Sequence, residues 1–166
     1  DGINQGNSFE PRHDRTHAIN IIANVDLNNF MREIRGEKLI HPDNHWTLGL
    51  NFTFLSGQPI TLPGSVYLMN QLPDWETNKN SIALYPSDIN TYNLPYYSRF
   101  DFSLTYDIQY DGWSLSPYLQ VFNLFSRKNV WFIQYKNEIK NGMIKQEIEN
   151  QNMFPILPSI GVTVKF

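Results

Sequence analysis

The segment from Arg99 to Tyr110 alternates strictly between polar and apolar side chains. All its even positions are apolar or aromatic and all its odd positions are polar. A β-strand sorts such a pattern onto two faces, because successive strand side chains point to opposite sides. The pattern lasts twelve residues, whereas a soluble strand averages about five or six and a bilayer-crossing strand needs about 9–11. We therefore expect a membrane-spanning strand, with its apolar face toward lipid and its polar face toward a lumen.

Four further segments alternate in the same way and predict strands near 17–28, 46–55, 113–125 and 156–166. Asp111-Gly112 predicts a tight hairpin turn after the first segment. The chain is thus expected to be all-β: about five long antiparallel strands that form part of a transmembrane β-barrel. Outer-membrane barrels have short periplasmic turns and long outer loops. By this parity, 29–44 is a periplasmic connection, and 56–98 and 126–155 are outer loops.

Composition excludes several other classes. The 166 residues fit one domain, and no run of about 18 apolar residues predicts a transmembrane helix. A net charge of −3 gives no support to a nucleic-acid partner. The absence of Cys excludes disulfides, thiol catalysis and thiolate metal sites. The mean hydropathy of −0.42 is typical of a soluble protein, but lumen residues dilute the apolar signal of a barrel.

The two long loops supply the candidate ligand contacts, because aromatic faces bind sugars, peptides and planar chelates. The alternative is that these rings pack the loops against each other. Within 126–155, the halves 131–135 and 144–148 flank Asn141-Gly142 and predict a protruding hairpin. The candidates are Tyr67, Trp75, Tyr85, Tyr92, Trp131, Phe132 and Tyr135.

The polar faces of the strands predict a lumen wall and no active site. Asp101 and Asp107 are six residues apart, roughly 20 Å along a strand, which is too far for a paired-carboxylate mechanism. His13 and His17 lie where a loop leads into a strand, so their side chains point in different directions. We therefore expect a polar cluster there and no metal site. No phosphate loop or nucleophile elbow is present, and we expect neither enzymatic activity nor a cofactor. The residues expected to face the lumen are Arg99, Asp101, Asp107, Asn51 and Thr163.

Five motifs, taken in order, resemble a known family. They are Asp14-Arg15-Thr16-His17 before a strand; 46–52 followed by Ser56-Gly57-Gln58-Pro59; Arg99-Phe100-Asp101; Val121-Phe122-Asn123-Leu124-Phe125; and an alternating C-terminal strand that ends in Phe166. Their order and spacing are similar to the last five strands of TonB-dependent outer-membrane receptors of Bacteroidota-like Gram-negative bacteria. The resemblance covers nearly all of residues 1–166, which would form the C-terminal part of one barrel domain.

The resemblance implies a 22-stranded barrel in the cell outer membrane that takes up a scarce nutrient actively. Phe166 would belong to the signal that the barrel assembly machinery recognises. We find no plug-domain motif in 1–166 and expect the rest of the barrel and the plug to come from the same or another chain. The implied partners are outer-membrane lipid and the TonB complex, which would act through that plug. A surface lipoprotein lid is a possible further partner.

Two alternatives stay open. One is an outer-membrane barrel that does not use TonB, or a secretion or adhesion component. The other is a soluble carbohydrate-binding β-sandwich, in which the same alternation would turn the apolar face into a core.

Overall fold

The computed structural model describes residues 3–36, 43–69, 81–140 and 143–166. These residues form two compact units. The sheet unit comprises His17–Leu55, Tyr97–Asn129 and Phe154–Phe166, and the hairpin unit comprises Asp1–Thr16, Ser56–Tyr96 and Val130–Met153. Strands dominate both units, which confirms the all-β prediction.

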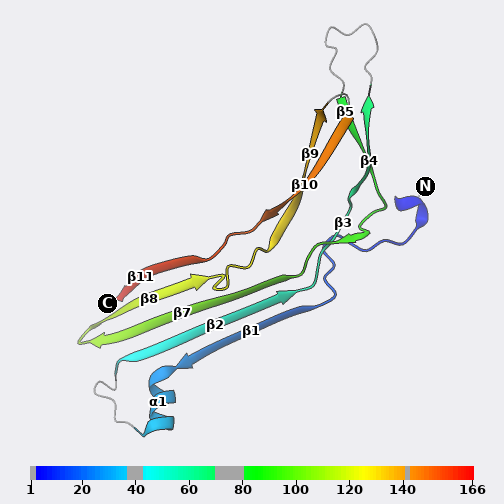
Figure 1. The fold of residues 1–166 in the computed structure, drawn as a ribbon. Coiled ribbons are helices and arrows are strands. Elements are labelled where there is room, and N and C mark those ends of the chain that lie inside the picture. Colours follow the sequence, from blue (N-terminus) through cyan, green and yellow to red (C-terminus); the bar gives the residue numbers. More distant parts are fainter. Residues whose placement is uncertain (1–2, 37–42, 70–80, 141–142) are drawn as a thin grey trace. The chain divides into compact units, whose positions relative to one another are not determined.

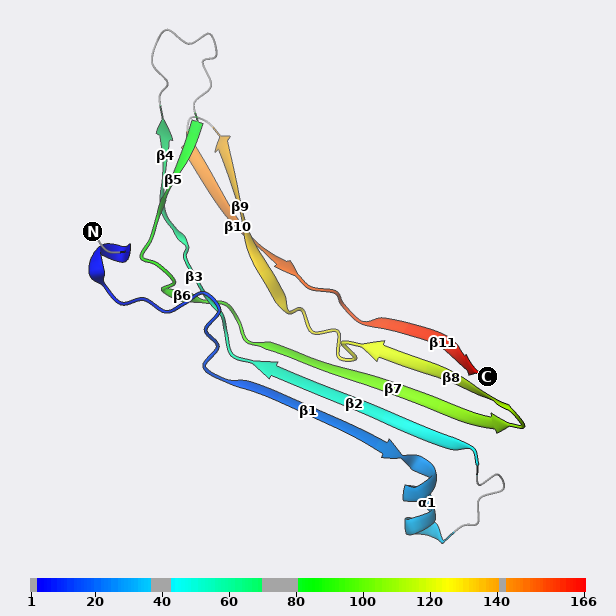
Figure 2. The same cartoon turned by 180° about the vertical axis from the view of Figure 1, so that it is seen from behind.

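The sheet unit is a five-stranded antiparallel sheet with the strand order β1-β2-β7-β8-β11. Its strands are β1 (Ala18–Asp26), β2 (His45–Leu55), β7 (Tyr97–Tyr110), β8 (Trp113–Phe122) and β11 (Leu157–Lys165). Figures 1 and 2 show this order from opposite sides. The five predicted long strands are confirmed, although three of them end earlier than predicted. In the described residues the sheet is open, with β1 and β11 at its edges, and no closed barrel forms.

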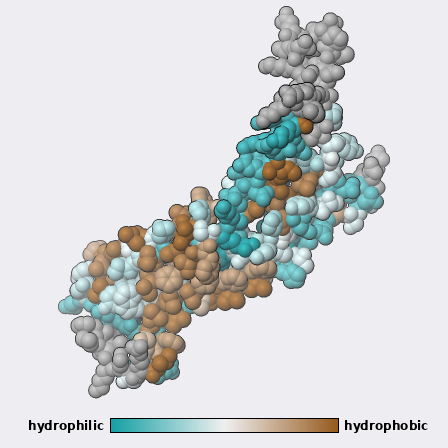
Figure 3. All heavy atoms as spheres, in the orientation of Figure 1, coloured by the Kyte–Doolittle hydropathy of each residue, from teal (hydrophilic) through white to brown (hydrophobic). Residues whose placement is uncertain are grey.

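The pairing register places apolar residues of all five strands side by side. One row crosses the whole sheet through Val25, Leu48, Leu104, Leu119 and Ile160. Because side chains alternate along a strand, the neighbouring rows two residues away extend the same apolar face. Ile160 keeps 82% of its surface exposed, and Figure 3 shows brown, hydrophobic side chains gathered over this part of the molecule.

The described residues of the sheet unit form no buried hydrophobic core. Among the side chains that the structure describes, the one buried hydrophobic residue is Leu94, which belongs to the hairpin unit. A soluble antiparallel sheet normally covers one face with a second layer. The described part of the sheet unit supplies no such layer for the apolar face.

A helix occupies part of the segment that we predicted as a connection, at 29–44. The helix α1 spans Leu27–Arg35, so β1 ends at Asp26 and does not reach residue 28 as predicted. The Asp26 carboxylate accepts hydrogen bonds from the backbone N–H groups of Asn28 and Asn29, and Gly36 ends the helix in the left-handed conformation, with φ 67°. The apolar residues at 27, 30, 31 and 34 follow a helical spacing. The start of the helix was not predicted because the alternating pattern of β1 continues past Asp26 in the sequence.

The described residues of the hairpin unit form three two-stranded pairs. β3 (Pro59–Ile60) pairs with β6 (Tyr92–Asn93), β4 (Pro63–Met69) with β5 (Ser81–Pro86), and β9 (Val130–Lys140) with β10 (Met143–Asn152). A 3₁₀ turn, η1, covers Ile3–Gly6. The predicted hairpin in 126–155 is confirmed, whereas the description of 56–98 as loop was incomplete. Pro59 and Pro63 begin β3 and β4, and Pro86 ends β5, which two-stranded pairs tolerate. The Asn141-Gly142 turn lies outside the described residues.

Gly57 allows two backbone segments of the hairpin unit to approach closely. A Cβ atom at this position would lie 2.0 Å from the carbonyl oxygen of Leu94. The Leu94 N–H in turn donates a 2.9 Å hydrogen bond to the carbonyl of Gln58. The Ser-Gly-Gln-Pro corner therefore requires glycine for steric reasons.

We expect Gly57→Ala to destabilise this corner, because backbone atoms must move to admit the methyl group. Overpacking of this kind costs about 1–3 kcal/mol. Amide hydrogen exchange checks the prediction: the Leu94 N–H should exchange faster in the variant. The Ser87 N–H, bonded to the carbonyl of Leu62, serves as the control in the same unit. Unchanged protection at Leu94 would contradict the steric argument.

Candidate functional site

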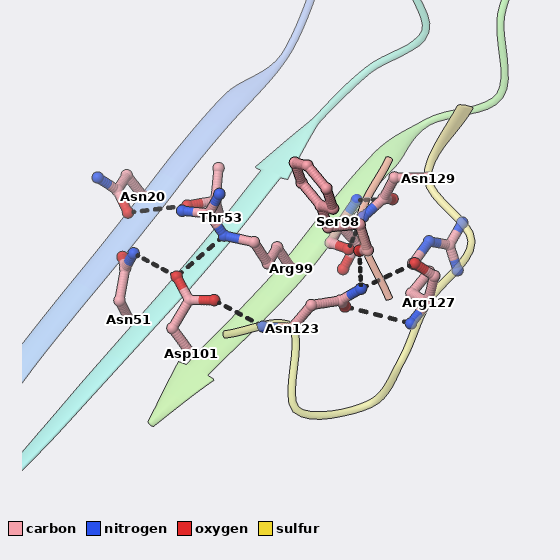
Figure 4. Close-up of polar contacts among 10 residues, drawn as sticks. Asn20, Asn51, Thr53, Ser98, Arg99, Asp101, Asn123, Arg127 and Asn129 are labelled. Carbon is pink, nitrogen blue, oxygen red and sulfur yellow. Dashed lines mark hydrogen bonds and ion pairs between the residues drawn. The ribbon is translucent and has the colours of Figure 1, made fainter. Parts of the chain in front are cut away.

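Asp101 is the centre of the polar network on the second face of the sheet unit. Its Oδ2 accepts a 3.2 Å hydrogen bond from Asn51 Nδ2 and lies 2.9 Å from Arg99 Nε in an ion pair. Its Oδ1 accepts a 3.0 Å hydrogen bond from the backbone N–H of Asn123 (Figure 4). The Arg99 guanidinium also lies 4.4 Å from the centre of the Phe122 ring. Both carboxylate oxygens of Asp101 are therefore engaged in structural contacts.

Asn123 shapes the corner that follows β8. It is 1% exposed and adopts the left-handed conformation with φ 53°, which asparagine tolerates better than most residues. Its Nδ2 donates to the carbonyls of Arg127 and Phe154, both at 3.0 Å. Its Oδ1 accepts from the Arg127 N–H at 3.1 Å (Figure 4). One side chain thus satisfies three backbone groups and holds the turn against the segment that leads into β11.

Asn129 extends this corner along β7. Its Oδ1 accepts from the Ser98 N–H at 3.0 Å, and its Nδ2 donates to the Ser98 carbonyl at 2.9 Å. The side-chain amide therefore replaces a strand partner for Ser98 beyond the end of β8, as Figure 4 shows. Asn129 is 3% exposed, so water does not compete with these two bonds.

The predicted lumen residues share one face of the sheet. Asn51 lies opposite Asp101 in the register, and Arg99 and Asp107 occupy alternate positions of β7. Ser116 donates a hydrogen bond to Asp107 and lies opposite Thr163. Asp101 and Asp107 have separate partners, as predicted from their spacing. Among the described residues, no three His, Asp or Glu side chains are arranged to hold a metal ion.

A cleft of about 250 Å³ in the hairpin unit brings three predicted ligand contacts together. Trp131 and Phe132 meet edge to face, with 5.2 Å between ring centres. Tyr135 lines the same cleft, and burial together with the nearby Tyr92 raises the pKa of its phenol above the ordinary 10.0. The other lining residues are Arg12, Gln58, Ile60, Thr61, Asn90, Leu94 and Ile133.

Hydrogen bonds hold the polar wall of this cleft in place. Arg15 Nη2 donates to Gln58 Oε1 at 3.2 Å, and its Nη1 donates to the Ser56 carbonyl at 3.0 Å. The Asn90 N–H donates to Thr61 Oγ1 at 2.9 Å, and Asn90 Nδ2 donates to the Glu10 carbonyl at 2.6 Å. The cleft thus offers flat aromatic surface beside fixed amide groups. This arrangement can stack and hydrogen-bond a ligand, and its lining contains no nucleophile beside a general base.

Three other predicted aromatic contacts belong to the hairpin unit but do not line this cleft. Tyr67 and Tyr85 are on the β4–β5 pair, 47% and 65% exposed, and Tyr92 is on β6. Trp75 lies outside the described residues. The prediction missed Arg12, Gln58, Thr61 and Asn90, because polar loop residues carry no periodic signal and the fold alone brings these segments together. The Ser-Gly-Gln-Pro motif did point to the corner that contains Gln58.

The chain matches no protein-family model, no curated protein and no solved structure. Within the described residues, no helix has the length and apolar character needed to cross a membrane.

Two substitutions of Asn123 should separate its two roles, which are the hydrogen bonds of its side chain and its left-handed backbone conformation. We expect Asn123→Gly to destabilise the protein by about 1–3 kcal/mol, because three partly buried backbone groups lose their side-chain partner. Asn123→Ala should destabilise it further, because alanine is also strained at positive φ. Denaturant unfolding of both variants checks this order. Equal stability of Asn123→Ala and the parent protein would exclude a structural role for the corner.

Tyr135 should ionise at higher pH than an ordinary tyrosine. The pKa of its phenol is raised, so the unfolded chain ionises first as the pH passes 10.0, and the folded state loses stability from that pH upward. The difference between phenolate absorbance titrations of the parent and Tyr135→Phe should have its midpoint above 10.0. Tyr92→Phe should move this midpoint toward the ordinary value. A midpoint at or below 10.0 would contradict the described environment of Tyr135.

Proposed function

We propose that this chain is part of the wall of an outer-membrane β-barrel, and that the complete barrel is a TonB-dependent transporter for active uptake of a scarce nutrient. The observation that carries the proposal is the division of the sheet into two faces. One face carries uncovered apolar rows across five strands, and the other carries the hydrogen-bonded network around Asp101. A barrel strand alternates between lipid-facing and lumen-facing residues in the same way.

Lipid supplies the layer that the apolar face lacks. Ile21, Ile160 and Val162 keep 58%, 82% and 59% of their surfaces exposed. In water, an apolar surface of this kind marks an interaction site or an aggregation hazard. A soluble sandwich would need a second sheet against this face, and the described part of the sheet unit contains none. This comparison favours the membrane protein over the soluble rival.

The open edges also favour a barrel. β1 and β11 each present a row of backbone groups that no strand of the described sheet pairs. In hydrocarbon, each unpaired group costs several kcal/mol, so spanning sheets close into barrels. We therefore infer that further strands, from the same or another chain, pair with β1 and β11.

Aromatic side chains mark the two ends of the apolar face. Trp46 stacks on Tyr106 and Tyr110 stacks on Trp113, each pair with 4.4 Å between ring centres. At the other end, the rings of Phe100 and Phe125 lie 5.5 Å apart. Phe100 and Tyr110 are separated by roughly 33 Å along the strand, or about 25 Å after a tilt of about 40°, which matches the apolar band of outer-membrane barrels. Such aromatic girdles are typical of membrane interfaces.

The transport function rests on the motif resemblance and on the cleft of the hairpin unit. By strand parity, the Asp111-Gly112 turn lies on the periplasmic side and the hairpin unit belongs to the outer loops. Trp131, Phe132 and Tyr135 would then contact ligand outside the cell, and binding without bond chemistry fits a transporter and not an enzyme. The plug and the TonB complex would supply energy coupling.

Two adjacent positions of β8 test the membrane topology. Leu119 lies on the apolar face and Gln120 on the polar face, and both are exposed. Residues 1–166 contain no Cys, so Leu119→Cys and Gln120→Cys can each carry one spin label in the full protein, with any Cys of its other parts replaced, reconstituted in nanodiscs. We expect the label at 119 to collide with oxygen, which partitions into lipid, and the label at 120 to collide preferentially with a water-soluble nickel chelate. A label at 119 shielded from both relaxants would favour the soluble sandwich and overturn the proposal.

An arginine at the same two positions should have unequal effects on stability. Leu119→Arg should destabilise the inserted protein by about 2–4 kcal/mol, because it places a charge near the bilayer midplane. Gln120→Arg, on the polar face, should change the stability little. Unfolding from lipid vesicles with denaturant measures both effects. Equal effects of the two substitutions would contradict the assignment of the faces.

The intact mass of the outer-membrane protein that carries this C-terminal sequence tests the transporter part. A mass several-fold above 19.5 kDa would agree with a receptor that includes plug and remaining strands in one chain. A mass near 19.5 kDa would favour a barrel assembled from several chains and count against an ordinary TonB-dependent receptor.

A further inference from the structure

Helix α1 carries an apolar stripe that nothing in the described sheet unit covers. Leu27, Phe30, Met31 and Ile34 follow the i, i+3, i+4, i+7 spacing and share one side of the helix. Phe30, Met31 and Ile34 are 48%, 38% and 65% exposed. The opposite side is polar and consists of Asn28, Asn29, Arg32 and Glu33.

Both ends of α1 are capped, so the helix is a defined element and not a fraying turn. Asp26 accepts hydrogen bonds from two backbone N–H groups of the first turn, and the Gly36 N–H donates to the carbonyl of Arg32 at 2.9 Å. Asn29 Nδ2 adds a 2.7 Å bond to Asp26. A nine-residue helix is marginal in water by itself, so these caps matter for its stability.

A polar network ties α1 to one end of the sheet. Asn28 Nδ2 donates to the carbonyl of Asn44, and Asn44 Oδ1 accepts a 3.0 Å bond from the Gln109 N–H. Asn44 Nδ2 reaches the hydroxyl of Tyr106 at 3.3 Å. Tyr106 is the ring that stacks on Trp46, so the helix is held at the end of the sheet where the aromatic pairs lie.

We propose that α1 lies in the headgroup region of the phospholipid leaflet at the Asp111-Gly112 end of the barrel. Its stripe of Phe30, Met31 and Ile34 enters the acyl boundary, and Arg32 on the polar side reaches the lipid phosphates. This inference rests on the proposed barrel and adds an interfacial anchor to it. The occupant is lipid because the stripe begins where the apolar face of the sheet ends. Figure 3 shows brown side chains over the strands and over α1 in one view of the molecule.

The chemistry of α1 fits an interfacial helix. Such helices combine an apolar face with a charged face and lie in the plane of the membrane, with the apolar side buried about 5–10 Å. Aromatic residues prefer the same depth, so Phe30 and the Trp46–Tyr106 pair would mark one level. The helix would then limit vertical movement of the β1–β2 end of the barrel wall.

Fluorescence quenching in nanodiscs of phosphatidylethanolamine and phosphatidylglycerol tests the proposal with the full protein. Ile34→Cys and Glu33→Cys each receive an environment-sensitive fluorophore, and Leu119→Cys is the reference for the apolar face of the sheet. We expect the probe at 34 to emit at shorter wavelength than the probe at 33. Lipid carrying a nitroxide near its headgroup should quench the probe at 34, and lipid carrying a nitroxide deep in its acyl chain should quench the probe at 119. Aqueous iodide should quench the probe at 33.

The outcomes separate the two proposals. If lipid nitroxide quenches the probe at 119 but not the probe at 34, the barrel stands and the interfacial helix is wrong. A probe at 34 shielded from both quenchers would mean that protein covers the stripe, which also overturns the inference. If the probe at 119 is not quenched by lipid, the proposed barrel itself fails. A further variant, Ile34→Ala, should reduce the blue shift of a probe placed at Phe30→Cys, because it weakens insertion of the stripe.

Discussion

The cross-strand register is the constraint on which the sheet unit depends. Pairing Leu48 with Leu104 and Leu104 with Leu119 brings the apolar faces of β2, β7 and β8 into phase. A shift of one residue in any strand would send its apolar side chains to the polar face. Since the described part of the sheet unit has no hydrophobic core, backbone pairing and the environment of its two faces must supply its stability. The stability of the sheet unit therefore depends on what contacts its apolar face.

The polar face is organised by a few asparagine and aspartate side chains. Asp101 contacts Asn51 on β2, Arg99 on its own strand β7, and the backbone N–H of Asn123 just after β8. Asn123 and Asn129 then replace backbone pairing where β8 ends. Short amide side chains suit this task because each offers a donor and an acceptor at once. Backbone groups of Ser98, Arg127 and Phe154 thus keep hydrogen-bond partners where the chain leaves the sheet.

The hairpin unit has a different physical character. Its strands form three separate pairs, and exposed ion pairs such as Lys136–Glu149 join the strands of one pair. The 2.5 Å hydrogen bond to Glu149 raises the pKa of Lys136. Trp131, Phe132 and Tyr135 line its cleft from the first half of β9, whereas acidic and basic residues occupy the rest of the β9–β10 pair.

The sequence by itself determined the strands and their faces. Strict alternation through Phe100–Tyr110 and Trp46–Phe54 has only one regular backbone solution, so the all-β prediction and the shared face of Asn51, Arg99 and Asp101 followed from local pattern. Tertiary structure alone decided the short pairs within 56–98 and the cleft that joins Arg12, Asn90 and Trp131. The physical reason is the range of the interactions. Alternation is a property of neighbouring residues, whereas the cleft and the Gly57–Leu94 contact depend on segments distant in sequence whose approach no local pattern encodes.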